Sequence, residues 1–257
     1  MSTRHVVVTG AGTGIGRAIA IRQARDGATV GLVGLREDEL EETAAAIDGP
    51  THVAACDVRV REDVEAAFGA IAEAQGQIHA FVAVSGIGGG NGEDDEGGDR
   101  FDDLVRTNLY GTYYCVRAAL RRLAPGPEAR HVVVISSILA RIAVPGYTGY
   151  SASKAGLLGL VRSLAAELAP DNVQVNAVCP GWVDTNLWQR NAQGLAAELG
   201  ARTEEEARRL AARKNSLNRF GRPEELANAI VFLCSERASY ITGVSLNLDG
   251  GRLKGLW

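Results

Sequence analysis

The chain has 257 residues, of which 46% are hydrophobic and 23% charged, a balance typical of globular proteins. Its formal net charge of −4 gives no basic surface of the kind that nucleic acids or anionic membranes bind. The four cysteines are widely spaced, and no apolar run reaches membrane-spanning length. We therefore expect one cytoplasmic domain over residues 1–257, without disulfides or a metal site.

Apolar segments of strand length alternate with longer segments of helical periodicity. Continuous valine-rich runs are typical of strands buried on both faces of a parallel sheet. We expect strands at 5–9, 28–33, 51–55, 80–85, 131–137, 173–178 and 244–248. We expect helices near 15–25, 36–47, 60–75, 101–123, 150–169 and 223–234. The alternation predicts an α/β fold of the doubly wound Rossmann type, with a mainly parallel seven-stranded sheet and helices on both faces.

The first expected strand is followed by TGAGTGIG, which leads directly into a helix. A turn with so little side-chain bulk presents backbone N–H groups and a helix N-terminus to a pyrophosphate. The alternative is a tight turn without a ligand, but the strand before and the helix after are the context that a dinucleotide motif requires. The residues expected to hold the dinucleotide here are Gly10, Thr13, Gly14, Ile15 and Gly16.

The second expected strand ends in GLVGLRED, at the place where a carboxylate would bind the ribose 2′-hydroxyl of NAD. Gly34 stands there instead, followed by Leu35 and Arg36. The missing carboxylate removes repulsion against a 2′-phosphate, and the arginine can pair with that group. We therefore expect NADP(H) in preference to NAD(H). The alternative is that Arg36 is an exposed charge at the helix start, its field weakened by Glu37 and Asp38.

Two segments interrupt the alternation of strands and helices. The glycine- and acid-rich segment 86–103 follows the fourth expected strand, and it is either a solvated loop or part of the ligand-binding edge of the sheet. The segment 182–217 precedes the last expected helix and contains Trp182 and Trp188. We expect it either to cover the substrate pocket or to be a surface excursion packed through these tryptophans.

The stretch GYTGYSASKAG places Tyr150 and Lys154 four residues apart, on one face of a helix. Hydride transfer between an alcohol carbon and a nicotinamide requires a proton to move on or off the oxygen. A lysine ammonium one turn away, with the positive nicotinamide, would lower the pKa of the phenol from about 10. This predicts Tyr150 as the general acid/base, whereas Tyr147 would precede the helix and contact substrate or pack.

Taken in order, these motifs resemble the short-chain dehydrogenase/reductase family, in its ketoacyl-reductase-like branch, over essentially the whole chain. The matching pieces are TGAGTGIG, CDV, NLYG, VISS, YSASK, NAVCPGWVDT and NRFGRPEELANAIVFLCSERASYITGVSLNLDGG. The resemblance implies an NAD(P)-dependent enzyme that interconverts a secondary alcohol and a ketone. It also implies a homotetramer or dimer, formed through the expected helices 101–123 and 150–169.

The resemblance further implies a role for each site residue. Ser137 would hold the substrate oxygen. Ser136 is the competing choice, but side chains alternate along a strand, so we expect only one of the two to face the site. Asn108 would hold a water in a proton relay, and Lys154 would also bind the nicotinamide ribose. The remaining implied cofactor contacts are Leu35, Arg36, Asp57, Val58, Ser85, Gly86, Tyr150, Pro180, Gly181, Val183 and Thr185. The expected substrate contacts are Ser137, Leu139, Tyr147, Trp182, Leu187 and Trp188.

The chain departs from the family pattern after the fourth expected strand, where residues 83–86 read AVSG in place of N-N-A-G. We expect this change to remove polar links within the sheet without abolishing the site. The apolar and aromatic substrate contacts indicate an apolar ketone. A 3-oxoacyl thioester is the alternative substrate, and a catalytically silent nucleotide sensor or scaffold is the alternative of another class.

Overall fold

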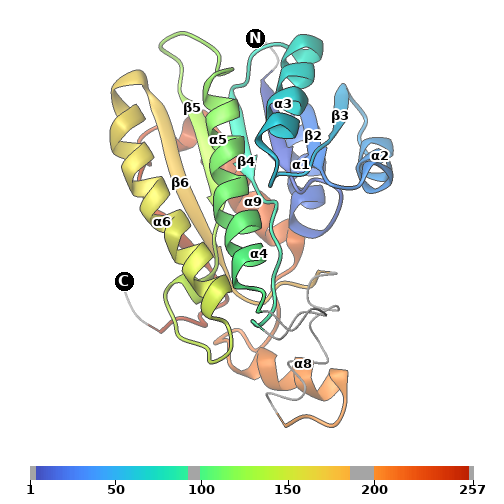
Figure 1. Ribbon diagram of the computed structural model, residues 1–257, viewed down its shortest axis with the longest axis vertical. Helices are drawn as coiled ribbons and strands as arrows, with labels where there is room; N and C mark the ends of the chain where they lie inside the picture. Colours follow the sequence, from blue (N-terminus) through green and yellow to red (C-terminus); the bar gives the residue numbers. More distant parts are fainter. Residues whose placement is uncertain (1–3, 92–98, 186–199, 255–257) are drawn as a thin grey trace.

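The structure is a computed structural model that describes residues 4–91, 99–185 and 200–254. Within these residues, seven parallel strands form one sheet in the order β3-β2-β1-β4-β5-β6-β7 (Figure 1). The strands are β1 (His5–Thr9), β2 (Thr29–Gly34), β3 (Thr51–Ala55), β4 (Ala80–Ala83), β5 (Arg130–Ile135), β6 (Val173–Pro180) and β7 (Ser245–Leu248). The predicted doubly wound sheet is confirmed, with all seven strands at their expected places.

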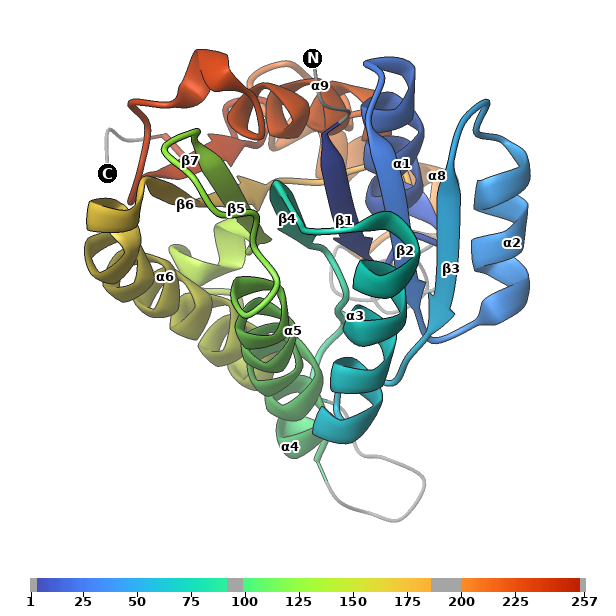
Figure 2. The ribbon, with the colours of Figure 1, turned by 90° about the horizontal axis from the view of Figure 1, so that it is seen from above.

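Helices cover both faces of the sheet, as Figure 2 shows from above. One face carries α1 (Gly14–Arg25), α2 (Glu37–Ala45) and α9 (Pro223–Leu233). The other carries α3 (Arg61–Gln75), α4 (Phe101–Val105), α5 (Thr112–Leu120) and α6 (Thr148–Leu168). A separate helix, α8 (Glu204–Arg213), lies apart from the sheet at the lower end of the molecule in Figure 1. No helix of the described part is long and apolar enough to cross a bilayer.

The expected helix 101–123 is interrupted in the structure. A π-helical segment, Arg106–Gly111, separates α4 from α5. The spacing of apolar residues does not reveal this segment, because a single wider turn changes the helical pattern of the sequence too little to be recognised. Such insertions occur frequently at functional sites, and this one contains Asn108, whose side chain is fully buried.

The strand β4 ends at Ala83, two residues before its expected end. The N–H groups of Val84 and Ser85 donate to Oγ1 of Thr9, at 3.1 and 3.3 Å, and so leave the ladder. Thr9 thus links the end of β1 to the altered segment 83–86. The polar connection that we expected this segment to lose is provided from the neighbouring strand.

Candidate active site

Two adjoining cavities lie where the strands end, with volumes of about 290 and 320 Å³. They share Gly10, Thr13, Ser85, Gly86 and Ile87, so they form one groove across the carboxyl edge of the sheet. This edge is where ligands bind in open parallel sheets. In the described chain, no group of three or more His, Cys, Asp and Glu side chains is arranged to hold a metal ion.

The glycine turn between β1 and α1 has a backbone that only glycine fits. Gly10 and Gly14 have φ angles of 64° and 53°, in the left-handed region that favours glycine. A Cβ on Gly16 would lie 2.0 Å from the carbonyl oxygen of Gly10, and a Cβ on Gly10 would lie 3.0 Å from the amide of Ser85. The groove is therefore free of side chains where a pyrophosphate would lie, and this geometry fits a dinucleotide.

The second cavity is lined by Leu35, Arg36, Asp57 and Val58, as expected for an adenosine site, and also by Arg59. Leu35 is 68% exposed, so it presents an apolar surface to the groove. The Arg36 guanidinium is paired on its own helix, with Nη2 2.6 Å from Asp38. Arg36 therefore lies where a 2′-phosphate would bind, but its guanidinium already pairs with the Asp38 carboxylate.

Asp57 is held by an arginine that the sequence motifs did not single out. The side chain of Arg59 donates to both carboxylate oxygens of Asp57, at 3.0 and 2.7 Å, and these bonds lower the pKa of Asp57. Arg59 also reaches Asp103 at 3.3 Å. The adenosine end thus contains a second guanidinium two residues after the predicted aspartate.

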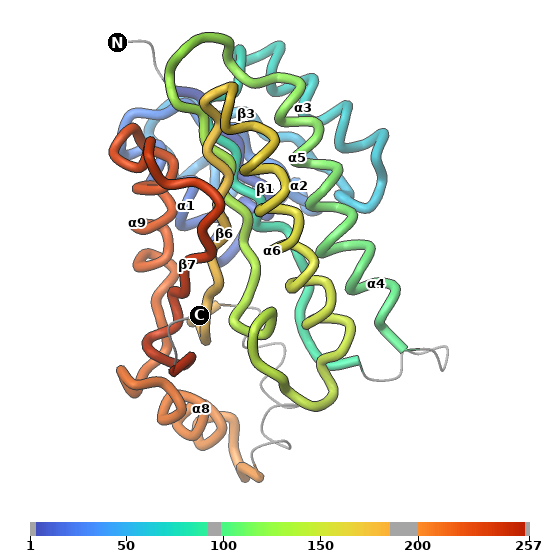
Figure 3. The backbone as a smooth tube through the Cα atoms, turned by 90° about the vertical axis from the view of Figure 1, so that its left-hand side faces the viewer, coloured from blue at the N-terminus to red at the C-terminus, as the bar shows by residue number. Residues whose placement is uncertain are grey.

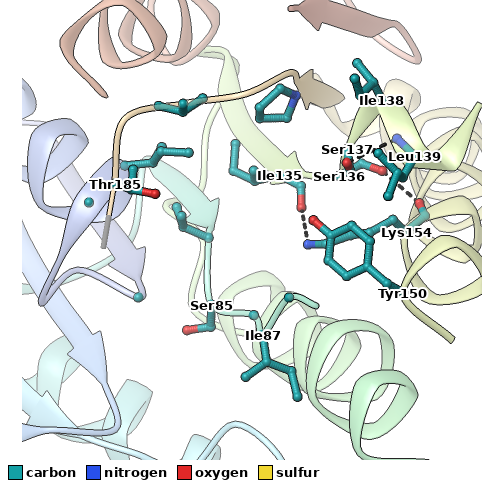
Figure 4. A pocket seen from close by; sticks show the side chains of 18 of the residues that line it. Ser85, Ile87, Ile135, Ser136, Ser137, Ile138, Leu139, Tyr150, Lys154 and Thr185 are labelled. Atoms are coloured by element: carbon teal, nitrogen blue, oxygen red, sulfur yellow. Dashed lines mark hydrogen bonds between the residues drawn. The ribbon is translucent and has the colours of Figure 1, made fainter. Parts of the chain in front are cut away.

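The first cavity brings together the predicted proton-transfer residues (Figure 4). Tyr150 and Ser137 both line this cavity, and Ser137 Oγ accepts the N–H of Leu139 at 3.1 Å. Lys154 Nζ lies 5.8 Å from the centre of the Tyr150 ring and donates to the carbonyl of Ile135 at 3.0 Å. The two side chains from α6 therefore meet in the cavity as the helical spacing predicted.

Both serines of the VISS motif line this cavity, contrary to the expectation that only one of them would. The Ser136 hydroxyl donates to the carbonyl oxygen of Lys154 at 2.7 Å and so ties β5 to α6. The Ser137 hydroxyl instead accepts the N–H of Leu139. The two positions are thus distinguished by their partners rather than by the faces of the strand.

Burial sets the acidity of the two titratable groups of the cavity. It raises the pKa of Tyr150, an effect that the hydrogen bond to Ser137 opposes, and it lowers the pKa of Lys154 to about 8. In the chain without a nicotinamide the pKa of Tyr150 is therefore raised, because loss of solvation outweighs the favourable contacts. The expected lowering included the charge of the bound nicotinamide and stays a prediction. At neutral pH the phenol carries its proton.

Asn108 lies behind the cavity rather than in its wall. Its Oδ1 accepts the N–H of Ile87 at 2.8 Å, and its Nδ2 donates to Ile87 O at 3.0 Å and to Ser153 Oγ at 3.2 Å. A Cβ on Gly86 would lie 2.8 Å from Asn108 Oδ1 and 3.4 Å from Lys154 Nζ. The amide thus fixes the loop after β4 close to the lysine.

The expected substrate contacts Leu139, Tyr147 and Trp182 line the same cavity, whereas Leu187 and Trp188 lie outside the described residues. Tyr147 precedes α6, as predicted. Residues 84, 135 and 138 also contribute to the wall but were not among the predicted contacts. Residues 87–89 line it as well, which supports the interpretation of this part of segment 86–103 as belonging to the ligand-binding edge of the sheet. All other predicted cofactor contacts line one of the two cavities.

The chain is similar to known proteins over nearly its whole length. A family model described as enoyl-(acyl carrier protein) reductase matches residues 10–252. The L-rhamnose 1-dehydrogenase (NAD(P)+) of Azotobacter vinelandii is 36% identical, over 96% of each chain. The 3-oxoacyl-[acyl-carrier-protein] reductase FabG of Aquifex aeolicus is 35% identical, over 95% of each chain. A variant of actinorhodin polyketide ketoreductase, solved with NADPH, superposes with a TM-score of 0.89 at 29% identity, over 98% of each chain.

Proposed function

The chain belongs to the short-chain dehydrogenase/reductase family, and it is an NAD(P)-dependent oxidoreductase that interconverts alcohols and ketones; from this premise we propose that Tyr150 moves the proton. The observation that supports this role is that Tyr150, Ser137 and Lys154 line one cavity, with Lys154 Nζ 5.8 Å from the centre of the Tyr150 ring.

Four residues have separate tasks in this proposal: Ser137, Tyr150, Lys154 and Asn108. The bound dinucleotide supplies or accepts the hydride. Ser137 holds the substrate oxygen beside the phenol, and Tyr150, which is protonated at neutral pH, donates its proton to that oxygen during ketone reduction. Lys154 stabilises the phenolate that remains and holds the ribose. Asn108 acts through Ile87 and Gly86, by keeping the loop after β4 in place.

We propose NADP(H) as the preferred cofactor, since Arg36 and Arg59 both line the adenosine end and no carboxylate ends β2. The test is a fluorescence titration of the protein with NADPH and with NADH, repeated with Arg36→Gln. We expect tighter binding of NADPH, and loss of that preference in the variant, because charge-assisted bonds to a phosphate would disappear. If the ratio of the NADPH affinity to the NADH affinity is the same before and after the substitution, Arg36 does not contribute to the cofactor preference.

An apolar, uncharged ketone fits the substrate end best. Lys154 is the one charged side chain among the described residues of this cavity, and Leu139, Tyr147 and Trp182 form an apolar wall. The relatives named 3-oxoacyl-[acyl-carrier-protein] reductase support a 3-oxoacyl thioester as the second candidate. Turnover of cyclic and aromatic ketones against acetoacetyl-CoA separates the two, and dinucleotide binding without any turnover would indicate the silent nucleotide-binding alternative.

We further propose that the protein is a cytoplasmic homotetramer whose segment 182–217 covers the substrate. Phe101, Tyr110 and Tyr113 on α4, the π-helical segment and α5 are 39%, 51% and 40% exposed. These aromatic side chains give that face an apolar surface of the kind that a second copy covers. Sedimentation analysis of the protein tests the assembly.

A further inference from the structure

Helix α8 has two small buried side chains and an arginine, Arg208, that is paired with a carboxylate outside the helix. Its buried residues are Ala207 and Ala211, which remove little apolar surface from water. Between them, Arg208 donates to both carboxylate oxygens of Asp184, at 2.8 and 2.6 Å. A two-bond pair of this kind fixes orientation as well as distance, so Arg208 sets how α8 lies at the lower end of the molecule (Figure 3).

The same guanidinium is the outer layer of an aromatic stack. Its carbon lies 4.9 Å from the centre of the Phe220 ring. The Phe220 ring is stacked on the Trp182 ring, with centres 6.0 Å apart and planes inclined by 15°. Trp182 in turn lines the cavity that holds Tyr150. The stack therefore connects Arg208, which lies outside both cavities, to the cavity wall.

Both contacts of Arg208 lead to one short segment, residues 182–185. Trp182 and Thr185 line the cavity, and Asp184 lies between them in the chain. Thr185 Cγ2 lies 3.2 Å from the position that a Cβ on Gly14 would occupy, next to the glycine turn. Backbone bonds of 2.9 Å join Asp184 N to Gly221 O and Gly221 N to Trp182 O. The segment is thus held on its outer side and faces the groove with its inner side.

We propose that Arg208 is a positioning residue for this segment, and that through Asp184 and the Phe220–Trp182 stack it sets the affinity of the groove for the dinucleotide. The inference rests on the proposed function of this site. Without Arg208, the Asp184 charge loses its partner and Trp182 loses the outer layer of its stack. In the unchanged protein the Arg208–Asp184 pair orders this segment before the ligand binds. Without the pair, ligand binding must order the segment, and the free-energy cost of this ordering weakens the affinity.

The first test is a double-substitution cycle on the pair. Arg208→Gln and Asp184→Asn are each expected to weaken binding of NADPH or NADH, whichever the unchanged protein binds, by about tenfold. The double variant is expected to bind no more weakly than either single one, because the two residues act as a unit. Arg209→Gln on the same helix is the matched control, since the ion pair of Arg209 within the described part of the chain is with Glu206 on α8 itself, at 3.8 Å. Single effects that add in the double variant would overturn the proposal.

The second test follows Trp182 directly and needs no ligand. In a background with Trp188→Phe and Trp257→Phe, Trp182 is the remaining tryptophan of the chain. Adding Arg208→Gln to this background is expected to increase acrylamide quenching of Trp182 fluorescence, whereas Arg209→Gln leaves it unchanged. Unchanged quenching with Arg208→Gln would refute the stack. If the unchanged protein binds neither dinucleotide, the proposed function fails, while the quenching comparison still decides whether Arg208 orders the segment.

Discussion

Tyr147 and Tyr150 both line the cavity, and Lys154 Nζ lies 5.8 Å from the centre of the Tyr150 ring. Replacing Tyr150 by Phe removes the transferable proton and keeps the ring. We expect kcat for ketone reduction to fall by about 10² to 10⁴, the usual contribution of a general acid, while NADPH binding persists. Steady-state kinetics together with the fluorescence titration measure both.

Tyr147→Phe is the matched control for this comparison, because it removes a phenol from the same cavity. We expect kcat to stay near that of the unchanged protein, since Tyr147 precedes the first residue of α6 and stands seven residues, about two turns, before Lys154. A loss as large as that of Tyr150→Phe would move the proton-transfer role to Tyr147.

At the scale of elements, the start of α6 depends on a residue far away in the chain. The N-cap residue of this helix is Tyr147, and its side chain makes no capping hydrogen bond. Instead, Gly149 N donates to Oδ1 of Asn91 at 2.9 Å, and Asn91 N donates to Gly146 O at 2.7 Å. The loop after β4 therefore fixes the helix end one residue before Tyr150.

Asn91→Ala removes this cap, and we expect the free energy of unfolding to fall by about 1 kcal/mol and kcat to fall with it, because the helix end that carries Tyr150 loosens. Urea unfolding and steady-state kinetics measure the two effects. Asn228→Ala is the control: Asn228 lies on α9 and bonds Arg22, away from the groove. An unchanged kcat in Asn91→Ala would show that the cap contributes to stability alone.

The sequence predicts those elements whose signal is local. Valine runs located all seven strands to within two residues, and four-residue spacing placed Tyr150 over Lys154. What depends on tertiary contacts was not predictable. The π-helical segment around Asn108 follows helical periodicity, the Arg59–Asp57 pair depends on the path of the chain after β3, and the direction of the Tyr150 pKa depends on burial.

For the whole molecule, the opposite edge of the sheet sets the response to acid. The starts of β1, β4 and β5 bring His5, His79 and His131 onto adjacent strands, joined by the bonds His79 N–His5 O and His131 N–His79 O. His131 is fully buried, and neither of its ring nitrogens has a hydrogen-bond partner among the residues that the structure describes. Burial, and then the charge of Arg4, lower its pKa to about 4. Burial also lowers the pKa of His5 and of His79.

The sign of the effect follows from which state binds the proton. Between about pH 6.5 and 4 the unfolded chain protonates His131 and the folded chain does not, so the free energy of unfolding falls as the pH drops through this window. By about pH 5 the loss from His131 amounts to about 2 kcal/mol.

His131→Phe fills the same site without a titrating group, and its free energy of unfolding should fall by about 2 kcal/mol less than that of the unchanged protein between about pH 7.5 and 5. Urea unfolding at the two pH values measures the difference, with His52→Gln on the edge strand β3 as the control. An equal loss in the unchanged protein and in His131→Phe would mean that His131 is already protonated in the folded chain, and that the acid response comes from other groups.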